Sequence, residues 1–267
     1  VVETYHTRPS EFLLEMAKRE PRRLVYAAFK RPEGADWSIG LKRNIGASLA
    51  TGEFIANFDD DDIYAPEYLT TMVDCMKKKS ALGVTLSSWY VFDSATDSIG
   101  YSNPSIEANM RWMDEDVTLE NVRKWTYGYG FSYVHLRQAV LDVPYGSINL
   151  GEDYAFYSEL LRLHGEECIA LLEDKCGICL HTQHRANTAR DFALWQVPTE
   201  SVSDLSFSDF YPVFDRHRRL CRQQQPGRGD GGPRARPERS IFEFSFARSA
   251  PRRLREVAVH LPGGESP

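Results

Sequence analysis

Four consecutive aspartates, Asp59 to Asp62, follow a short apolar run and lie just before Pro66. Like charges this close together repel one another unless a positive group lies among them. If the extended backbone of the apolar run continues, Asp59 and Asp61 face one way and Asp60 faces the other. Two carboxylates on one side form a hard-oxygen site for Mg²⁺ or Mn²⁺, whose shell is completed by water and phosphate oxygens. The pattern therefore predicts a clamp for a metal ion and a diphosphate.

A structural interpretation of the same cluster is an acidic collar on the helix that begins near Pro66. Such a collar contributes about 0.3–1 kcal/mol through the helix dipole. One or two carboxylates suffice for it, whereas four repel one another, so we favour the metal site. The spacing excludes an EF-hand, whose ligands alternate along a longer loop with a late Glu.

Two further stretches have residue types that could do chemistry. The run from Cys176 to His184 contains Cys-x-x-Cys and two histidines, but zinc sites usually separate their two ligand pairs by a dozen or more residues. We therefore interpret its cysteines as part of a buried strand. The second stretch has alternating aromatic residues, which form either an acceptor platform or a half-buried strand: Trp125, Tyr127, Tyr129, Phe131 and Tyr133.

The elements that position these residues alternate between strands and helices. Apolar runs predict strands at 1–5, 24–29, 54–58 and 82–92, the third of them buried in a parallel sheet. Ser10 and Ser38 are predicted helix caps, and Pro66 opens a third helix with Leu69, Met72, Val73 and Met76 on its inner face. Farther along, 128–136 is predicted to be extended, 153–163 helical, and 168–172 and 177–180 short strands. This alternation predicts an α/β fold.

Composition and charge divide the chain unevenly. The 267 residues are 42% hydrophobic with a net charge of -6, which gives no overall reason to expect a nucleic-acid partner. We predict one domain at 1–221, with halves 1–100 and 101–221, and a disordered Gly/Pro/Arg-rich tail at 222–267. No signal peptide and no apolar run of about 20 residues is visible, so a cytoplasmic location is expected for the chain as written. Its start at Val1 predicts a fragment, and membrane association of a longer parent stays open.

Residues 42–62, read together, resemble the nucleotide-sugar half of inverting family-two glycosyltransferases with the GT-A fold. The family pattern is R-N-x-G, then A-x-G-E-(Y/F)-I-A, then D-x-D-D, and here it reads RNIG, ATGEFIA and DDDD. Gly151-Glu152-Asp153 resembles the E-D motif at the start of an acceptor-side helix. The run from His184 to Thr188 is similar to the family's H-x-x-N-T segment. The resemblance covers about residues 1–190 and implies a GT-A-type, mostly parallel sheet flanked by helices.

The resemblance implies metal-dependent, inverting transfer of a sugar from a nucleoside-diphosphate sugar to a carbohydrate or other hydroxyl acceptor. A UDP-sugar is the expected donor, and Mn²⁺ or Mg²⁺ the expected cofactor. The implied metal ligands are Asp61, Asp59 and His184, and the implied base is Asp153 with Glu152 beside it. The implied substrate-binding residues are Glu3, Arg43, Asn44, Asp59, Asp60 and Trp125.

The chain also departs from the family pattern. A first strand and helix are expected to be absent, and Glu3 is the remaining acidic residue of the strand end that contacts the nucleoside. One alternative is therefore a non-catalytic carbohydrate- or nucleotide-binding module derived from this fold. A nucleotidyltransferase, the second alternative, needs a basic phosphate loop near the first strand, which the sequence does not contain.

Overall fold

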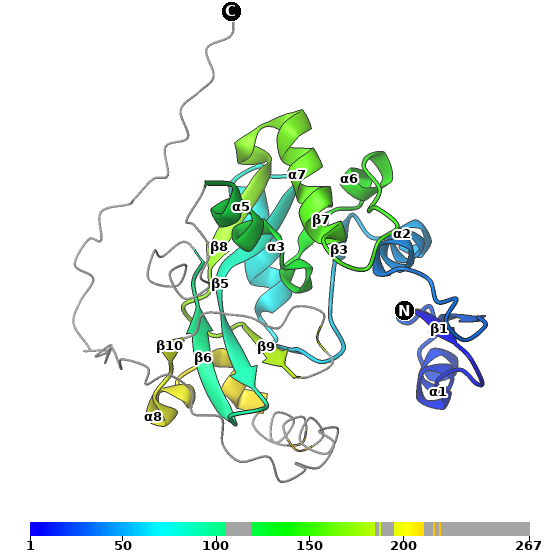
Figure 1. The fold of residues 1–267 in the computed structure, drawn as a ribbon, viewed down its shortest axis with the longest axis horizontal. Helices are drawn as coiled ribbons and strands as arrows, with labels where there is room; N and C mark the ends of the chain where they lie inside the picture. The colour runs from blue at the N-terminus through cyan, green and yellow to red at the C-terminus, as the bar shows by residue number, and fades with distance from the viewer. Residues whose placement is uncertain (105–118, 185–186, 188–194, 211–215, 217–218, 220–267) are drawn as a thin grey trace, which may run out of the picture. The chain divides into compact units, whose positions relative to one another are not determined.

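The computed structural model describes residues 1–104, 119–184, 187, 195–210, 216 and 219 (Figure 1). By compactness the chain divides into Val1–Gly227 and Arg228–Pro267, and every described residue lies in the first unit. That unit is a mixed α/β fold with a sheet flanked by helices, which confirms the predicted class. The predicted disordered tail lies outside the described residues, and the domain boundary after residue 221 stays a prediction.

The strands in chain order are β1 (Val2–Tyr5), β2 (Ala27–Lys30), β3 (Phe54–Ala56), β4 (Ile63–Tyr64), β5 (Gly83–Asp93), β6 (Ser98–Ser102), β7 (Val134–Leu136), β8 (Ile169–Glu173), β9 (Cys179–Gln183) and β10 (Trp195–Gln196). The α-helices are α1 (Glu11–Arg19), α2 (Ile39–Leu49), α3 (Tyr68–Lys78), α5 (Leu119–Tyr127), α6 (Arg137–Asp142), α7 (Glu152–His164) and α8 (Thr199–Val202). Short 3-10 helices are η2 (Gly130–Ser132), η3 (Glu166–Cys168) and η4 (Ser206–Phe210).

The N-terminal elements begin with the two predicted caps. β1 and β2 pair in parallel as a two-stranded sheet, with α1 between them in the chain. The Ser10 side chain accepts the N–H of Leu13, and the Ser38 side chain accepts the N–H of Leu41. Each serine satisfies one N–H that lacks a partner within the first turn of its helix, which is why both helices begin where the sequence predicts.

β5 is the central strand of the larger, eight-stranded sheet. The antiparallel strand β7 and the parallel strand β8 flank its first half, and antiparallel β6 and parallel β9 flank its second half. The strand order runs β10-β6-β5-β7-β3, and β4 pairs with β9. Nine of the eleven residues of β5 are buried, as expected for a strand covered on both faces.

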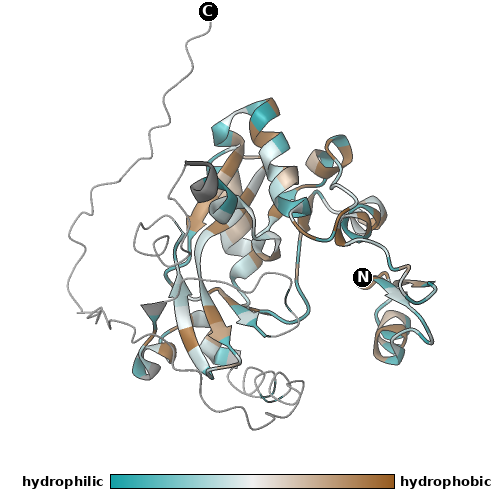
Figure 2. Ribbon diagram, in the orientation of Figure 1, coloured by the Kyte–Doolittle hydropathy of each residue, from teal (hydrophilic) through white to brown (hydrophobic). Residues whose placement is uncertain are grey.

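Helices cover both faces of this sheet. α3 contributes Tyr68, Met72 and Met76 to one apolar cluster, while α7 contributes Phe156 and Leu160 to another. Successive residues of β8 alternate between the two clusters, so the clusters lie on opposite faces of the sheet. Brown and teal segments alternate along α7 in Figure 2, as in a helix with one buried side.

Three sequence expectations are wrong. The predicted strand 54–58 is shorter, and β3 pairs antiparallel with β7 at one end of the strand order instead of lying inside a parallel sheet. The segment 128–136 is not one strand, because η2 interrupts it and extended pairing begins at Val134. On α3 the inner position belongs to Tyr68, whereas Leu69 is 43% exposed, because the helix begins two residues after Pro66.

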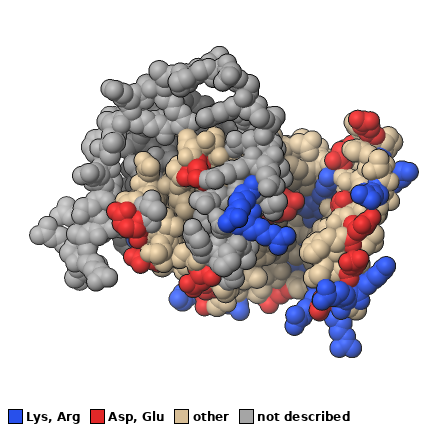
Figure 3. Space-filling model, turned by 90° about the horizontal axis from the view of Figure 1, so that it is seen from below, with Lys and Arg blue, Asp and Glu red and all other residues tan. Residues whose placement is uncertain are grey.

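Acidic and basic side chains are interspersed on the face shown in Figure 3. Among the helices that the structure describes, none combines the length and the apolar character that crossing a bilayer requires.

Candidate active site

The four aspartates lie in a turn between β3 and β4. One carboxylate oxygen each from Asp59, Asp61 and Asp62 lie within 4.8 Å of one another. Asp60 is exposed and does not belong to this group. The structure therefore brings Asp59 and Asp61 together and leaves Asp60 apart, although a turn at residues 60 and 61, not a strand, produces the arrangement.

The end of β9 supplies partners for two of these carboxylates. His184 Nε2 lies 2.9 Å from Asp61 Oδ2, and the Asn187 side-chain amide donates to the same oxygen at 3.4 Å. At the next residue of the chain, Asp62 Oδ2 lies 3.0 Å from His181 Nδ1. The structure thus places His184 beside Asp61 and adds His181, another residue of the run from Cys176 to His184.

Burial and mutual repulsion raise the pKa values of Asp59 and Asp61. Burial, together with the charge of Asp62, raises the pKa of Asp59 to about 6. The same two causes raise the pKa of Asp61, against the opposing effect of His181 and His184. Burial lowers the pKa of His181, but the charge and hydrogen bond of Asp62 outweigh it and leave that pKa raised. The donor set of carboxylates and one accessible imidazole suits a divalent cation, which would relieve the repulsion.

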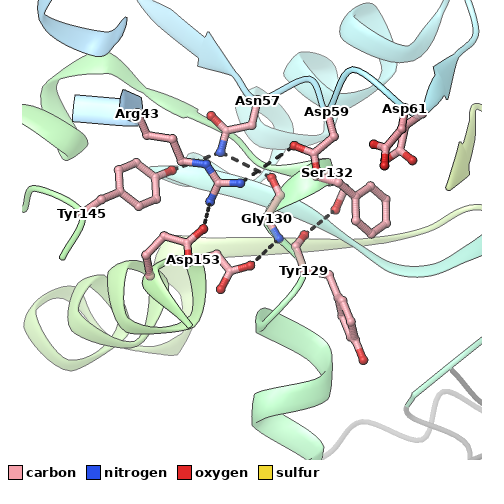
Figure 4. Close-up of polar contacts among 12 residues, drawn as sticks. Arg43, Asn57, Asp59, Asp61, Tyr129, Gly130, Ser132, Tyr145 and Asp153 are labelled. Carbon is pink, nitrogen blue, oxygen red and sulfur yellow. Dashed lines mark hydrogen bonds and ion pairs between the residues drawn. The ribbon is translucent and has the colours of Figure 1, made fainter. Parts of the chain in front are cut away.

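Arg43 joins this acidic turn to α7. Its Nη2 lies 3.9 Å from Asp59 Oδ1 (Figure 4). Its Nη1 donates to Glu152 Oε1 at 2.8 Å. The guanidinium also lies over the Tyr145 ring, 5.5 Å from its centroid. Only 15% of the Arg43 side chain is exposed, so its charge acts at short range on both carboxylates.

Glu152 and Asp153 begin α7, after Gly151 in the left-handed conformation (φ 80°). Asp153 Oδ2 accepts a hydrogen bond from the Gly130 N–H at 2.8 Å, and Oδ1 accepts one from the Tyr154 N–H at 2.7 Å. Burial raises the pKa of Asp153 even though these two bonds oppose the shift. Burial likewise raises the pKa of Glu152 against the charge of Arg43. Asp153 is therefore a fixed carboxylate that is more basic than usual.

Residues outside the predicted site hold this arrangement together. The Asn57 amide donates to the Gly130 carbonyl at 3.3 Å and to the Tyr145 hydroxyl at 3.2 Å. A Cβ on Gly130 would lie 2.7 Å from Arg43 Nη1 and 2.8 Å from the Asp153 Cβ, so glycine is required there. Asn57 precedes the acidic turn by two residues, which is the one local signal that could have identified it.

Asn44, Glu3 and Trp125 have structural contacts in this fold. Both polar atoms of the Asn44 amide bind the Tyr145 backbone, at 2.8 and 2.9 Å, and so tie α2 to the chain before α7. Glu3 accepts the Ser10 N–H at 3.1 Å and the Tyr26 hydroxyl. Trp125 is 7% exposed on α5. Their substrate-binding roles, like that of Asp60, stay predictions.

The other two sequence interpretations are resolved by burial and secondary structure. Trp125 and Tyr127 lie on a helix and Phe131 in η2, so the alternating aromatic residues do not form one strand. Cys179 is buried in β9, as predicted, whereas Cys176 is exposed before that strand. Among the described residues, the aspartate group is the candidate cluster for a metal, and neither cysteine belongs to it.

Comparison with known proteins identifies a related family. Residues 12–142 match the family described as Glycosyl transferase family 2, a segment that contains Arg43 and the acidic turn. The matched segment is that of a family-two glycosyltransferase. No curated protein sequence matches the chain.

Several solved structures are similar at low sequence identity. S. aureus TarS 1–349 in complex with UDP is 17% identical, with a TM-score of 0.44 over 69% of this chain and 51% of that chain. The complex of TarS 1–349 with UDP-GlcNAc is 16% identical, with a TM-score of 0.44 over 72% and 52%. M. tuberculosis glucosyl-3-phosphoglycerate synthase with Mn²⁺, UDP-glucose and phosphoglyceric acid is 14% identical, with a TM-score of 0.43 over 81% and 67%. The present chain spans about half the length of the TarS 1–349 chains.

Proposed function

We propose that this domain transfers a sugar from a nucleoside-diphosphate sugar to an acceptor hydroxyl, with inversion at the anomeric carbon and with a divalent cation. The observation that carries the proposal is the position of Arg43 between Asp59 and Glu152. Arg43 thereby links the aspartates that could bind a cation to Glu152, the neighbour of the candidate base Asp153. These two groups of carboxylates lie far apart in the sequence. Transfer from a diphosphate needs both groups.

The residues that would hold the cation are Asp59, Asp61 and His184. Asp61 and His184 already share a hydrogen bond, so their ligand atoms lie near one point. Burial, together with the charge of Asp62, raises the pKa values of Asp59 and Asp61, and a bound divalent cation would favour their charged forms. A bound Mn²⁺ or Mg²⁺ would neutralise charge on the diphosphate leaving group.

Asp153 is the proposed base for the acceptor hydroxyl. Its two oxygens are oriented by the N–H groups of Gly130 and Tyr154, and its raised pKa favours proton uptake. Glu152 is held by Arg43 and is the proposed orienting neighbour. Because the acceptor oxygen itself attacks while Asp153 removes its proton, one displacement occurs and the anomeric configuration inverts.

The test is a calorimetric titration of UDP, with and without Mn²⁺, into wild type, Asp61→Ala and Asp74→Ala. Asp74 is an exposed aspartate on α3 and serves as the control. We expect metal-dependent binding that Asp61→Ala loses and Asp74→Ala retains. Metal-independent binding that is unaffected in Asp61→Ala would contradict the cation site.

UDP is the first probe because a UDP-sugar is the expected donor, and GDP is the second. A positive titration is followed by hydrolysis of UDP-glucose and UDP-GlcNAc without an acceptor, and by NMR of the anomeric proton of any transfer product. Binding without turnover of any donor would favour the non-catalytic module instead. A product with retained configuration would contradict the proposed single displacement.

A further inference from the structure

Asp62 differs from the other aspartates of the turn in its accessibility. Its side chain is 0% exposed, whereas those of Asp61 and Asp59 are 27% and 41% exposed. Asp62 Oδ1 accepts the backbone N–H of Thr182 at 2.8 Å, and its Oδ2 lies 3.0 Å from His181 Nδ1. Both oxygens therefore already have partners from β9, even though one of them is close enough to the other carboxylates to be a third ligand.

The histidine that pairs with Asp62 is itself fixed. The His181 ring stacks on the Phe131 ring with centroids 4.5 Å apart and planes 20° apart. The side chain is 9% exposed, and its pairing with Asp62 spans 119 residues of sequence. By contrast, the nearby His184 side chain is 14% exposed and pairs with the more accessible Asp61. The acidic turn and the β9 region thus form two histidine–aspartate pairs, of which Asp62–His181 is buried and Asp61–His184 is more accessible.

Tyr64 restrains the same turn from β4. Its hydroxyl accepts the backbone N–H of Asp59 at 3.1 Å and donates to the Phe131 carbonyl at 2.9 Å. The backbone of Phe131 is thereby linked to Tyr64, and its ring to His181. Asp62, Tyr64, Phe131 and His181 form a connected set, which we call the brace, that holds both ends of the acidic turn to η2 and β9.

We propose that the brace is a positioning device: it fixes the acidic turn so that Asp59 and Asp61 present their oxygens to one cation, and Asp62 is not itself a ligand. This inference rests on the proposed function, because it assumes that the turn binds a cation. Groups that orient metal ligands without touching the metal commonly change its affinity by about 10- to 100-fold when they are removed. The brace residues are therefore expected to control cation affinity from outside the coordination shell.

The experiment is an electron paramagnetic resonance titration of Mn²⁺ with the full chain, in which the free ion is counted from its six-line signal. The brace variants are Tyr64→Phe and His181→Gln, and Asp61→Asn represents the loss of a ligand. Tyr101→Phe is the matched control, because it removes a part-buried hydroxyl that donates to Ser88 Oγ at 2.6 Å, outside the acidic turn. Tyr64→Phe preserves the ring and remains informative if His181→Gln does not fold.

We expect Mn²⁺ affinity to fall about tenfold in each brace variant, more in Asp61→Asn, and to stay at the wild-type value in Tyr101→Phe. Electron spin echo modulation from ligand nitrogen should persist in Mn²⁺-loaded His181→Gln and disappear in His184→Gln. Wild-type affinity in Tyr64→Phe, or loss of the nitrogen signal in His181→Gln, would overturn the positioning assignment alone. Absence of Mn²⁺ binding to wild type would instead overturn the proposed cation site, and the brace assignment with it.

Discussion

Replacing Arg43 by methionine tests whether its guanidinium keeps the buried Glu152 carboxylate charged. The two side chains are 15% and 5% exposed, and the ion pair joins them at 2.8 Å. Methionine retains an unbranched apolar stem while it removes the charge and the hydrogen-bond donors. In the variant, Glu152 must either remain ionised without its partner or take up a proton.

Protonation sets the upper limit of the cost. From the ordinary pKa of 4.5, protonating this carboxyl at pH 7 costs about 3.4 kcal/mol, since roughly 2.5 pKa units cost about 1.36 kcal/mol each. Leaving the charge buried and unpaired costs about 3–5 kcal/mol, and protonation limits the loss to about 3.4 kcal/mol. We expect the free energy of unfolding to fall by about 2–3.5 kcal/mol at pH 7. Loss of the contact with Asp59 adds little to this destabilisation, because the Asp59 side chain is 41% exposed and its oxygen lies 3.9 Å from Arg43 Nη2.

The pH dependence gives the result its direction. In the variant, the folded-state pKa of Glu152 lies above the unfolded value of 4.5, so its penalty grows above that pH and fades as pH falls. At pH 5 the penalty should be below about 1 kcal/mol. The assay is urea unfolding at pH 7, 6 and 5 of wild type, Arg43→Met, Glu152→Gln and the double variant. We expect the double variant to recover most of the loss at pH 7, because a neutral amide needs no counter-ion.

Two results would refute this reasoning. An unfolding free energy for Arg43→Met within about 0.5 kcal/mol of wild type at pH 7 would mean that the ion pair does not stabilise the fold. An equal loss at pH 5 and pH 7, with no recovery in the double variant, would mean that lost packing and not charge is responsible.

Three further outcomes are expected. Asp153→Asn should lower sugar transfer at least about 100-fold in an initial-rate assay, while calorimetry shows unchanged UDP binding; comparable transfer would exclude Asp153 as the base. Burial lowers the pKa of His135 to about 4. The neutral ring therefore contributes roughly 3 kcal/mol of stability, which is complete above about pH 6.5 and is lost as the pH falls to about 4. Urea unfolding of His135→Gln across this range should show a flatter pH dependence than wild type, and parallel curves would contradict the assignment. Gly130→Ala should lower the melting temperature and the transfer activity together, with a loss of about 1–3 kcal/mol in the free energy of unfolding. Gly146→Ala should change neither, because the nearest atom to its added Cβ, apart from its chain neighbours, would be 3.8 Å away.

Local residue patterns determined much of this protein. Ser10 and Ser38 specify helix starts because a serine hydroxyl satisfies an N–H within three residues. The buried run of β5 and the aspartates after β3 are also local features. The resemblance carried by the residues around Arg43 and Asp59 identified the family, which the match at 12–142 confirms.

Tertiary structure decided which of these residues meet. The sequence could not show that Arg43 lies between Asp59 and Glu152, because the pairing with Glu152 spans 109 residues and depends on how α2 and α7 pack. Local pattern predicted a strand over 54–58 and, if its geometry continued, extended aspartates, but β3 ends at Ala56 and, among the described strands, pairs with β7. The chain then turns, which separates Asp60 from its neighbours.

The different environments of Asp61 and Asp62 are the clearest case. These adjacent residues are identical in type, and nothing in their local sequence distinguishes an accessible carboxylate from a sealed one. The distinction comes from β9, which places His181 and the Thr182 N–H against Asp62 from 119 and 120 residues away. Sequence thus determined that a charged segment follows β3, whereas long-range packing determined which of its carboxylates stay accessible, because burial and hydrogen-bond partners are properties of the assembled fold.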